Sequence, residues 1–328
     1  MTDYREKANR AAYFNALYAM TLEHRVHPGL VYVYLPGLVK LHRLDEEDTL
    51  WLAFLNGITQ NPITTWRMFQ ELESCPRPGG ACGAFADWFN AEWPTLAFDT
   101  DRQKNKRLTL DAIEGYAALV QAAGSQRALY AGKSYQEAYA TAVSVPSFGR
   151  LSAFSYLEYV HLLGYGPGSD DLFFGDREGS RSHRNGMLFL HGQDHLVWDK
   201  RLPNGITGRY KNLPEMAKQM AARADQILLD FKHPDAGYNT FESALCAFKN
   251  SFFGRRYPGV YADMGWDRIQ WYEDRGTEYG TQTFRDLREE HLPDWLRIET
   301  EAKPTPRPER GKQFPETGTP YRAQHFLA

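Results

Sequence analysis

The chain has 328 residues, of which 42% are hydrophobic and 14% aromatic, and this composition predicts a globular protein with a sizeable core. Its 38 basic and 41 acidic side chains give a net charge of −3, which argues against a generally basic, tail-driven nucleic-acid binder. The three cysteines include no C-x-x-C pair, so the sequence predicts neither a disulfide framework nor a cysteine zinc site.

The N-terminal segment is charged and amphipathic, and we expect it to be part of the fold and not a secretory leader. The apolar stretch over 30–41 is interrupted by Pro36, Gly37 and Lys40 and is too short to span a bilayer. We therefore expect a cytoplasmic protein that is not inserted in a membrane.

Helical periodicity dominates the first half of the chain. Apolar residues recur every three to four positions in five segments, which are 4–22, 46–59, 64–72, 110–123 and 135–143. A further helix is predicted over 150–163, because the glycine- and proline-rich run at 164–168 is typical of a loop. The first half of the chain therefore predicts a helical array.

The middle of the chain has a less regular pattern. We expect long loops between 170 and 211, with 187–190 as the one tempting strand, and helices again over 215–231, 240–253 and 283–299. The predicted fold class is mainly α, with minor β structure and long loops. We expect one large helical catalytic unit over 1–299, which can subdivide near 164–212, and a proline-rich tail over 300–328 that wraps the surface or is partly disordered.

Charged residues are distributed unevenly along the chain. Residues 42–101 contain three basic and ten acidic side chains, a net charge of −7, whereas 177–211 contain seven basic and three acidic ones, a net charge of +4. Basic clusters either contact nucleic-acid phosphates or form a solvated surface. On the first interpretation, the candidate DNA contacts are Arg102, Lys104, Lys106, Arg107, Arg184, Lys200 and Arg201.

The segment 239–263 contains the densest group of chemically useful side chains. Glu242, Cys246 and Lys249 follow one another at i, i+4 and i+7, so a helix would place all three on one face. A nearby lysine can lower the pKa of a thiol, and a carboxylate can accept a proton. The same spacing also fits a buried cysteine beside a helix-stabilising ion pair, and spacing alone slightly favours that structural alternative.

Four motifs of the chain stand out, namely ESALCAFKN at 242–250, RRYPGVYAD at 255–263, FGRLSAFSYLEYV at 148–160 and LNGITQNPITTWRMF at 55–69. Together they resemble the α-glutamyl/putrescinyl thymine pyrophosphorylase family of phage enzymes, also described as amino acid:DNA transferases. The resemblance implies a scaffold similar to helix-hairpin-helix DNA glycosylases. It also implies a phage-type enzyme that acts in the cytoplasm of the host cell.

The resemblance implies DNA as the partner, with a thymine-derived base that carries 5-pyrophosphoryloxymethyl. The enzyme would displace pyrophosphate and couple an amine to the base methylene, such as glycine, glutamate or putrescine. The implied catalytic residues are Glu242, Cys246, Lys249 and Glu158. The implied pyrophosphate and substrate contacts are Arg150, Arg255, Arg256, Tyr257, Tyr261, Asp263, Asp176, Arg181, His183 and Asn185.

Two mechanisms fit these residues. In the first, the Cys246 thiolate adds to C6 of the ring and helps to expel pyrophosphate, and Glu242 or Glu158 deprotonates the incoming amine. In the second, the amine displaces pyrophosphate directly and no cysteine is needed. Either mechanism requires the base to leave the stack, and Trp66, Tyr257 and Tyr261 can stack on it, although each is also a plausible core residue.

The sequence predicts no resident metal or other cofactor. His191 and His195 could bind a metal together with Asp176 or Asp199, but their spacing is a weak signal, so we interpret them as structural. Magnesium could enter together with pyrophosphate. The alternative functions are a glycosylase-like, base-excising hydrolase and a non-catalytic DNA-binding module, and the sequence leaves the amine and the oligomeric state open.

Overall fold

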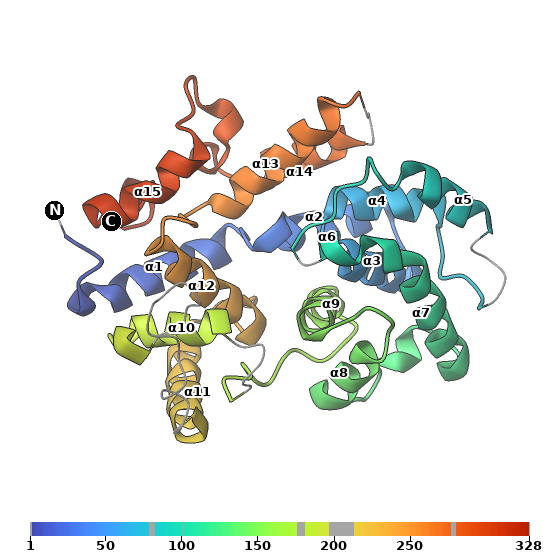
Figure 1. Cartoon of the computed structure of the whole chain (residues 1–328), viewed down its shortest axis with the longest axis horizontal. Coiled ribbons are helices and arrows are strands. Elements are labelled where there is room, and N and C mark those ends of the chain that lie inside the picture. Colours follow the sequence, from blue (N-terminus) through green and yellow to red (C-terminus); the bar gives the residue numbers. More distant parts are fainter. Residues whose placement is uncertain are drawn as a thin grey trace. The chain divides into compact units, whose positions relative to one another are not determined.

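The computed structural model describes residues 2–78, 83–100, 102–175, 181–196, 213–276 and 280–327. Throughout these ranges the regular structure is helical and contains no strand, which confirms the mainly α class (Figure 1). The predicted strand at 187–190 is wrong, because these residues form the last turn of helix α10 (Arg181–Leu190). None of the described helices combines the length and the apolar character needed to cross a membrane.

The chain forms two compact units, and each is assembled from separate segments. Unit 1 comprises Met1–Pro28, Asp170–Asp263 and Leu292–Ala328, and unit 2 comprises Gly29–Ser169 and Met264–His291. One boundary falls between Ser169 and Asp170, inside the region where the sequence allows a subdivision. That residues 1–299 act as one catalytic unit stays a prediction.

Unit 2 is built around α3, which packs against α4 and α9. Asp45 caps α3 and Asn61 caps α4, each by accepting a hydrogen bond from a backbone N–H of the first turn. The core is aromatic, and the rings of Phe54 and Tyr116 stack with their centroids 3.7 Å apart. Its helices are α2 (Val31–His42), α3 (Glu46–Thr59), α4 (Pro62–Glu71), α5 (Gly83–Glu92), α6 (Arg102–Asn105), α7 (Thr109–Ala123), α8 (Tyr135–Val143), α9 (Arg150–Leu162), most of α13 (Val260–Glu273) and α14 (Thr281–His291).

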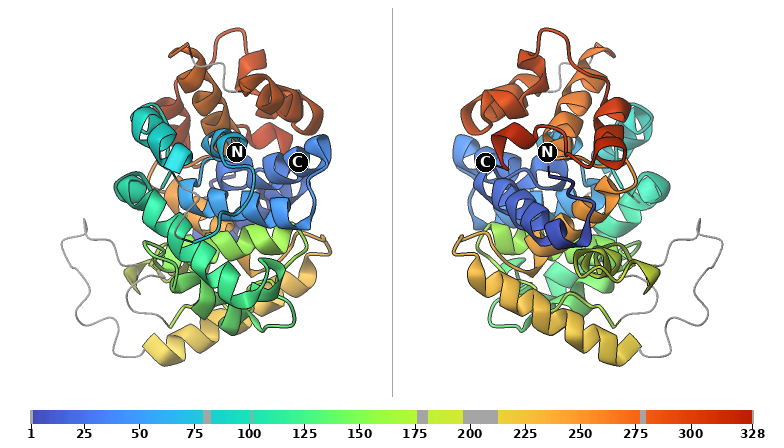
Figure 2. Two further views of the ribbon diagram at one scale, coloured as in Figure 1. Left: turned by 90° about the vertical axis from the view of Figure 1, so that its right-hand side faces the viewer. Right: turned by 90° about the vertical axis from the view of Figure 1, so that its left-hand side faces the viewer.

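Unit 1 is built around α12, against which α1 and α10 pack (Figure 2). Phe14 of α1 makes edge-to-face contacts with Phe241 and Phe248 of α12, which buries one side of α12 in an aromatic core. Helix α10 packs against the side of α12 that carries Glu242 and Cys246. The helices of this unit are α1 (Arg10–Glu23), α10 (Arg181–Leu190), α11 (Leu213–Asp230), α12 (Tyr238–Ser251) and α15 (Arg307–Thr317).

Two helices form where the composition did not predict them. Helix α2 contains Pro36, which lacks a backbone N–H and so leaves one hydrogen bond of the helix unmade. Most of the other residues of α2 are buried, and this burial offsets the lost hydrogen bond. Helix α15 lies in the proline-rich segment that we expected to wrap the surface or to be partly disordered. It packs firmly through Arg310 and Phe314, whose side chains are buried.

Candidate active site

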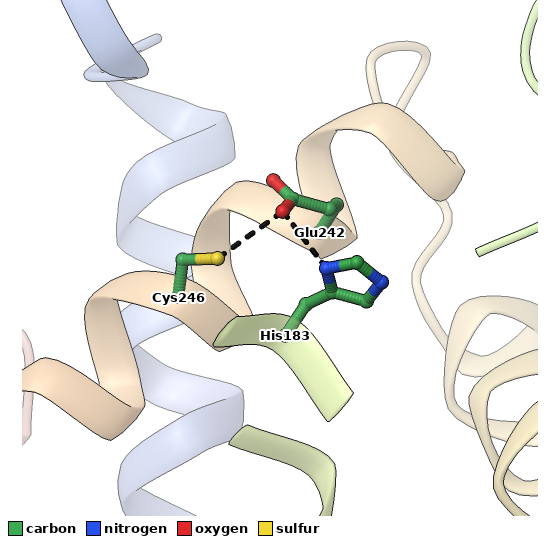
Figure 3. A group of neighbouring side chains, drawn as sticks. All are labelled: His183, Glu242 and Cys246. Carbon is green, nitrogen blue, oxygen red and sulfur yellow. Dashed lines mark hydrogen bonds and ion pairs between the residues drawn. The ribbon is translucent and has the colours of Figure 1, made fainter. Parts of the chain in front are cut away.

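Three side chains of different chemistry converge where α10 meets α12 (Figure 3). Glu242 and Cys246 lie one turn apart on α12, and His183 is the third residue of α10. The Glu242 Oε1 atom lies 3.0 Å from His183 Nδ1 and 3.2 Å from Cys246 Sγ. The prediction that Glu242 and Cys246 share one face of a helix is therefore confirmed.

A glycine allows α10 to approach α12 this closely. Gly186 lies one turn after His183, and a Cβ atom at this position would overlap the carbonyl oxygen of Leu245. The buried Met187 and Leu188 follow it and complete the apolar face of α10. The site therefore rests on two helices in direct backbone contact, and this contact limits the freedom of the three side chains.

The hydrogen bonds of His183 fix its tautomer. Its Nε2 atom lies 2.6 Å from the carbonyl oxygen of Leu172. A carbonyl oxygen only accepts, so the Leu172 contact assigns a proton to Nε2. The Nδ1 atom then faces Glu242 Oε1, and the 3.0 Å contact between two acceptor atoms requires one shared proton or another cation.

Glu242 is a partly buried carboxylate that stays ionised at neutral pH. Burial alone would raise its pKa, but the hydrogen bond with His183 and the charges of His183 and Lys249 outweigh burial and hold the pKa below the ordinary value of 4.5. Oε1 accepts from Cys246 and contacts His183, whereas Oε2 has no hydrogen bond to any described residue. The second oxygen is therefore available to a ligand.

Cys246 is a protonated thiol in this arrangement. Burial raises its pKa well above the ordinary range, and the charge of Glu242 adds to the effect. Ser182 and Lys249 act in the opposite direction but do not outweigh burial. Lys249 lowers the pKa of this thiol, as its spacing predicted, but burial and Glu242 outweigh it, so the expected thiolate is not favoured.

Lys249 and Arg256 supply positive charge near this group. The Lys249 Nζ atom donates to Ser182 Oγ at 3.1 Å. The Arg256 guanidinium lies 5.7 Å from the centroid of the Tyr261 ring. Burial raises the pKa of Tyr261 to about 12, and Glu242 contributes to the increase, so Tyr261 belongs to the same electrostatic neighbourhood.

Two other predicted substrate contacts are engaged in a separate, closed network. Asp263 forms buried ion pairs with Arg310 and Arg322, and the Tyr257 hydroxyl donates to Asp263 Oδ2 at 2.8 Å. These four side chains are buried. A structural role therefore explains Asp263 and Tyr257, and Arg255 is the exposed neighbour that keeps a free approach to solvent.

The remaining candidates of the 176–185 segment have mixed placements. This segment was expected to be a loop, but from Arg181 onward it is helix α10. Arg184 is buried and donates from Nη1 to the carbonyl oxygen of Phe174 at 2.9 Å, so it does not present its charge on a DNA-facing surface. Asn185 is also buried. Four candidates lie outside the part of the chain, or the side chains, that the structure describes: Asp176, Lys200, Arg201 and the side chain of Arg181.

Arg102 of the predicted DNA-binding cluster is structural. Its side chain is fully buried, with 0% exposure, and Nε donates to the carbonyl oxygen of Ile58 at 2.7 Å. Nη1 donates to the carbonyl oxygen of Ser147 at 2.8 Å. A guanidinium engaged in this way holds α6 in place and makes no contact with phosphate.

The other members of this cluster differ from one another. Lys104 and Arg107 are exposed, and their contact with DNA stays a prediction. Lys106 donates from Nζ to the carbonyl oxygen of Leu96 at 2.5 Å and lies over the rings of Trp93 and Phe98. Burial lowers the pKa of Lys106 to about 8.

Three predicted site residues lie in helices of unit 2. Arg150 begins α9 and Glu158 lies two turns later in the same helix; both are half-buried. Their roles in catalysis and substrate binding stay predictions. Trp66 stacks on Phe69 in α4 and is buried, as expected of a core residue.

The convergent group could hold a metal ion. One ligand atom each from His183, Glu242 and Cys246 lies within 4.8 Å of the other two. His191 and His195, the histidines that the sequence singled out, form no such group with described residues. Burial and the charge of Arg223 lower the pKa of His191 to about 4.

Comparison with known proteins establishes the class of the chain. A family model for amino acid:DNA transferases matches residues 35–257, which is more than half of the chain and includes the whole convergent group. The chain therefore belongs to the amino acid:DNA transferase family, whose members transfer an amino acid to DNA.

One curated relative extends this similarity over nearly the whole chain. A serinyltransferase of Salmonella phage ViI is 27% identical over 352 aligned residues, which cover 99% of this chain and 84% of the relative. No solved structure matches the chain. The similarity to helix-hairpin-helix glycosylases therefore stays a prediction.

The pairing of His183 with Glu242 was not predicted from the sequence. His183 was selected only as a polar donor in an expected loop. The available signal was Gly186 within a run whose apolar residues fit a helix, since a glycine inside a helix often marks a close approach of another backbone.

Proposed function

We propose that the chain transfers an amino acid to the exocyclic methylene of a 5-pyrophosphoryloxymethyluracil base in DNA and releases pyrophosphate. Family membership supports the amino acid and the DNA. One observation in the structure supports the chemistry most strongly. It is the partly buried, ionised carboxylate of Glu242. No described residue bonds to its second oxygen, Oε2, and the positive charge of Lys249 helps to keep it ionised.

The reaction forms one bond at carbon and breaks another. A lone pair of the amino acid attacks the methylene carbon, the bond from that carbon to the pyrophosphate oxygen breaks, and the electron pair leaves with pyrophosphate. The nucleophile loses one proton in the process. Glu242 Oε2 accepts this proton and passes it to solvent, and the ionised state of the carboxylate keeps it ready to do so.

The leaving pyrophosphate needs positive charge to stabilise it. Lys249 and Arg256 supply that charge, and the Ser182 hydroxyl that accepts from Lys249 holds the ammonium in place. An arginine also suits bidentate contact with a phosphoryl group. These two cations are therefore assigned to the leaving group, and Arg255 to the more exposed part of the nucleotide.

Direct displacement fits the site better than covalent catalysis by the unassisted thiol. The addition of Cys246 to the ring needs a thiolate, and burial together with Glu242 keeps the sulfur protonated. Direct displacement needs only the base Glu242 and the cations. On this account Cys246 supports Glu242 by donating to Oε1.

The co-substrate is an amino acid and not a diamine. The description of the family supports an amino acid. The relative is named a serinyltransferase, so serine is the first candidate. Glycine is the second, because the arginine supply near the site suits a carboxylate-bearing substrate.

A transfer assay tests the proposal. The protein is incubated with DNA that contains 5-pyrophosphoryloxymethyluracil and with serine, glycine, glutamate or putrescine in turn, and digested nucleosides are analysed by mass spectrometry. We expect a nucleoside adduct with at least one amino acid. Release of free base would instead support a glycosylase-like hydrolase, and no adduct with any amino acid would contradict the proposal.

A matched pair of lysine variants tests the placement of the site. Lys249→Met removes the ammonium beside Glu242, whereas Lys218→Met removes an exposed one from α11 in the same unit. We expect the first variant to lose about 100- to 1,000-fold in turnover, which is typical of losing one charge-stabilising donor. Equal activity of the two variants would place the chemistry elsewhere.

A further inference from the structure

The three convergent side chains offer a mixed nitrogen, oxygen and sulfur ligand set. His183 Nδ1, Glu242 Oε1 and Cys246 Sγ lie within 4.8 Å of one another, with Oε1 at 3.0 Å from Nδ1 and at 3.2 Å from Sγ. In a tetrahedral zinc site, metal–ligand bonds of about 2.0 to 2.3 Å separate neighbouring ligand atoms by about 3.4 to 3.6 Å. The two separations from Oε1 differ from these values by only a few tenths of an ångström, and the third pair, Nδ1 and Sγ, lies within 4.8 Å.

The surroundings of His183 match those of a metal-binding histidine. Its Nε2 atom donates to the Leu172 carbonyl oxygen at 2.6 Å, which leaves Nδ1 as the ring atom that faces the group. Metal-bound histidines commonly donate their second ring N–H to a backbone carbonyl in this way, because the bond fixes the tautomer and the ring orientation. A metal ion also replaces the proton that two acceptor atoms 3.0 Å apart otherwise have to share.

The helical framework preorganises the ligands. Glu242 and Cys246 are separated by one turn of α12. The contact of Gly186 with Leu245 holds α10, which carries the third ligand His183, close to α12. The side chains of His183 and Glu242 are only 10% and 20% exposed, so water competes little for the ligand atoms. The group is therefore buried enough to bind an ion and open enough to admit one.

We propose that His183 Nδ1, Glu242 Oε1 and Cys246 Sγ bind one divalent transition-metal ion of the zinc class. A thiolate and an imidazole are unsuited to magnesium or calcium, which prefer oxygen ligands. Binding of the ion releases the proton of the Cys246 thiol to solvent. The resulting thiolate and the carboxylate balance the charge of a divalent ion, so the site carries no net positive charge beside Lys249. Three protein ligands leave a fourth position open, as in catalytic zinc sites.

The open position gives the ion a function in the transfer reaction. It can bind an oxygen of the leaving pyrophosphate and stabilise the charge that develops there, an assignment that rests on the proposed function. Coordination through Oε1 leaves Glu242 Oε2 in place to accept the proton. The metal site itself depends only on the three ligands and is tested separately.

Metal binding by the purified full-length chain tests the site directly. The protein is stripped with a chelator, loaded with Zn²⁺ or Co²⁺ and dialysed. We expect one ion per chain, and for Co²⁺ the near-ultraviolet charge-transfer band that marks a sulfur ligand. If the protein retains no ion, the three side chains form an internal hydrogen-bond cluster only, and this result would overturn the proposal.

Variants with matched controls assign the ligands. Cys246→Ser should abolish the sulfur band, and His183→Gln should weaken binding by more than the roughly 10- to 100-fold that is typical of losing an outer partner. Cys75→Ser and His195→Gln remove a half-buried thiol and an exposed imidazole outside the group, and they should bind as the unmodified protein does. An unchanged band in Cys246→Ser would overturn the proposal.

Two further measurements remain decisive if a variant fails to fold. X-ray absorption on the loaded, unmodified protein should show one sulfur at about 2.3 Å and lighter ligands at about 2.0 to 2.1 Å, and a shell without sulfur would overturn the site. Full transfer activity in the metal-free protein would overturn the role of the ion and leave the proposed function intact. A loaded ion without any amino acid adduct would instead overturn the proposed function alone.

Discussion

Unit 1 contains two buried clusters, one around Asp263 and one around Glu242, and they differ in how many carboxylate oxygens have a hydrogen-bond or ion-pair partner. Asp263 is paired through both oxygens, Oδ2 with Arg310 and Tyr257 and Oδ1 with Arg322. Glu242 is held through Oε1 alone, and no described residue bonds to its Oε2. A fully paired acid stabilises a fold, whereas an acid with one unoccupied oxygen can act on a ligand.

The counter-charges of the two clusters show the same contrast. Two buried arginines neutralise Asp263, and Arg322 also donates to Glu301 at 3.0 Å, so the network closes on itself. Glu242 instead faces a histidine, a thiol and a lysine, which can exchange protons or bind a metal. Both acids occur in the segment 239–263, which the sequence presented as one site.

Glu242→Gln should have the largest effect on activity. The amide keeps the shape and can accept from Cys246 through its oxygen, but it cannot take a proton, so turnover should fall by about 10² to 10⁴. The free energy of unfolding should fall by about 1.5 to 3 kcal/mol, the worth of one hydrogen bond to a charged group, here the bond with His183. The measurement is single-turnover transfer alongside urea unfolding. Glu215→Gln, an exposed change on α11, should behave as the unmodified protein.

Asp263→Ala should have the largest effect on stability. It leaves Arg310 and Arg322 buried without their shared partner, and breaking a buried ion pair typically costs about 3 to 5 kcal/mol. Urea unfolding measures this loss. The molecules that remain folded should keep most of their turnover, and a stable but inactive variant would show that Asp263 acts in catalysis.

Gly186→Ala should have an intermediate effect, and it tests the contact that places His183. The added methyl group has to push α10 away from the Leu245 carbonyl, and overpacking of this kind typically costs about 1 to 3 kcal/mol. Gly83→Ala is the control, because a Cβ there meets no atom of a described residue within 4 Å. Thermal unfolding of both variants measures the difference, and equal stability would contradict the close approach.

Lys106→Met should have the smallest effect, which is a change in how the free energy of unfolding depends on pH. Burial lowers the pKa of Lys106 to about 8 in the folded chain, against 10.5 ordinarily. Between these values the unfolded chain binds a proton that the folded chain does not, so this residue makes the unfolding free energy rise with pH from about 8 to about 10.5. Unfolding at several pH values should show a shallower rise in Lys106→Met, and an unchanged rise in the exposed control Lys104→Met. Identical slopes for Lys106→Met and the unmodified protein would contradict the lowered pKa.

Local patterns in the sequence predicted much of the helical structure. The segment 46–59 coincides with α3 and 135–143 with α8, because capping residues and a regular apolar repeat act over a few neighbouring positions. The shared face of Glu242 and Cys246 follows from the same 3.6-residue period. These features depend on no distant part of the chain.

Features that depend on distant contacts could not be predicted in this way. The pairing of His183 with Glu242 needs α10 and α12 to cross at Gly186, and the burial of Arg102 needs acceptors from Ile58 and Ser147. A run of charges looks the same in a sequence whether its arginine faces phosphate or the backbone of its own protein. For this reason the predicted DNA surface retains Lys104 and Arg107 but not Arg102.

The count of pyrophosphate released for each amino acid nucleoside formed tests the central claim most directly. The unmodified protein is incubated with pyrophosphorylated 5-hydroxymethyluracil DNA and serine or glycine, and both products are quantified from one reaction. We predict equal amounts, and neither product with Glu242→Gln within the same time. Adduct formation without release of pyrophosphate, or undiminished transfer by Glu242→Gln, would contradict displacement at this site.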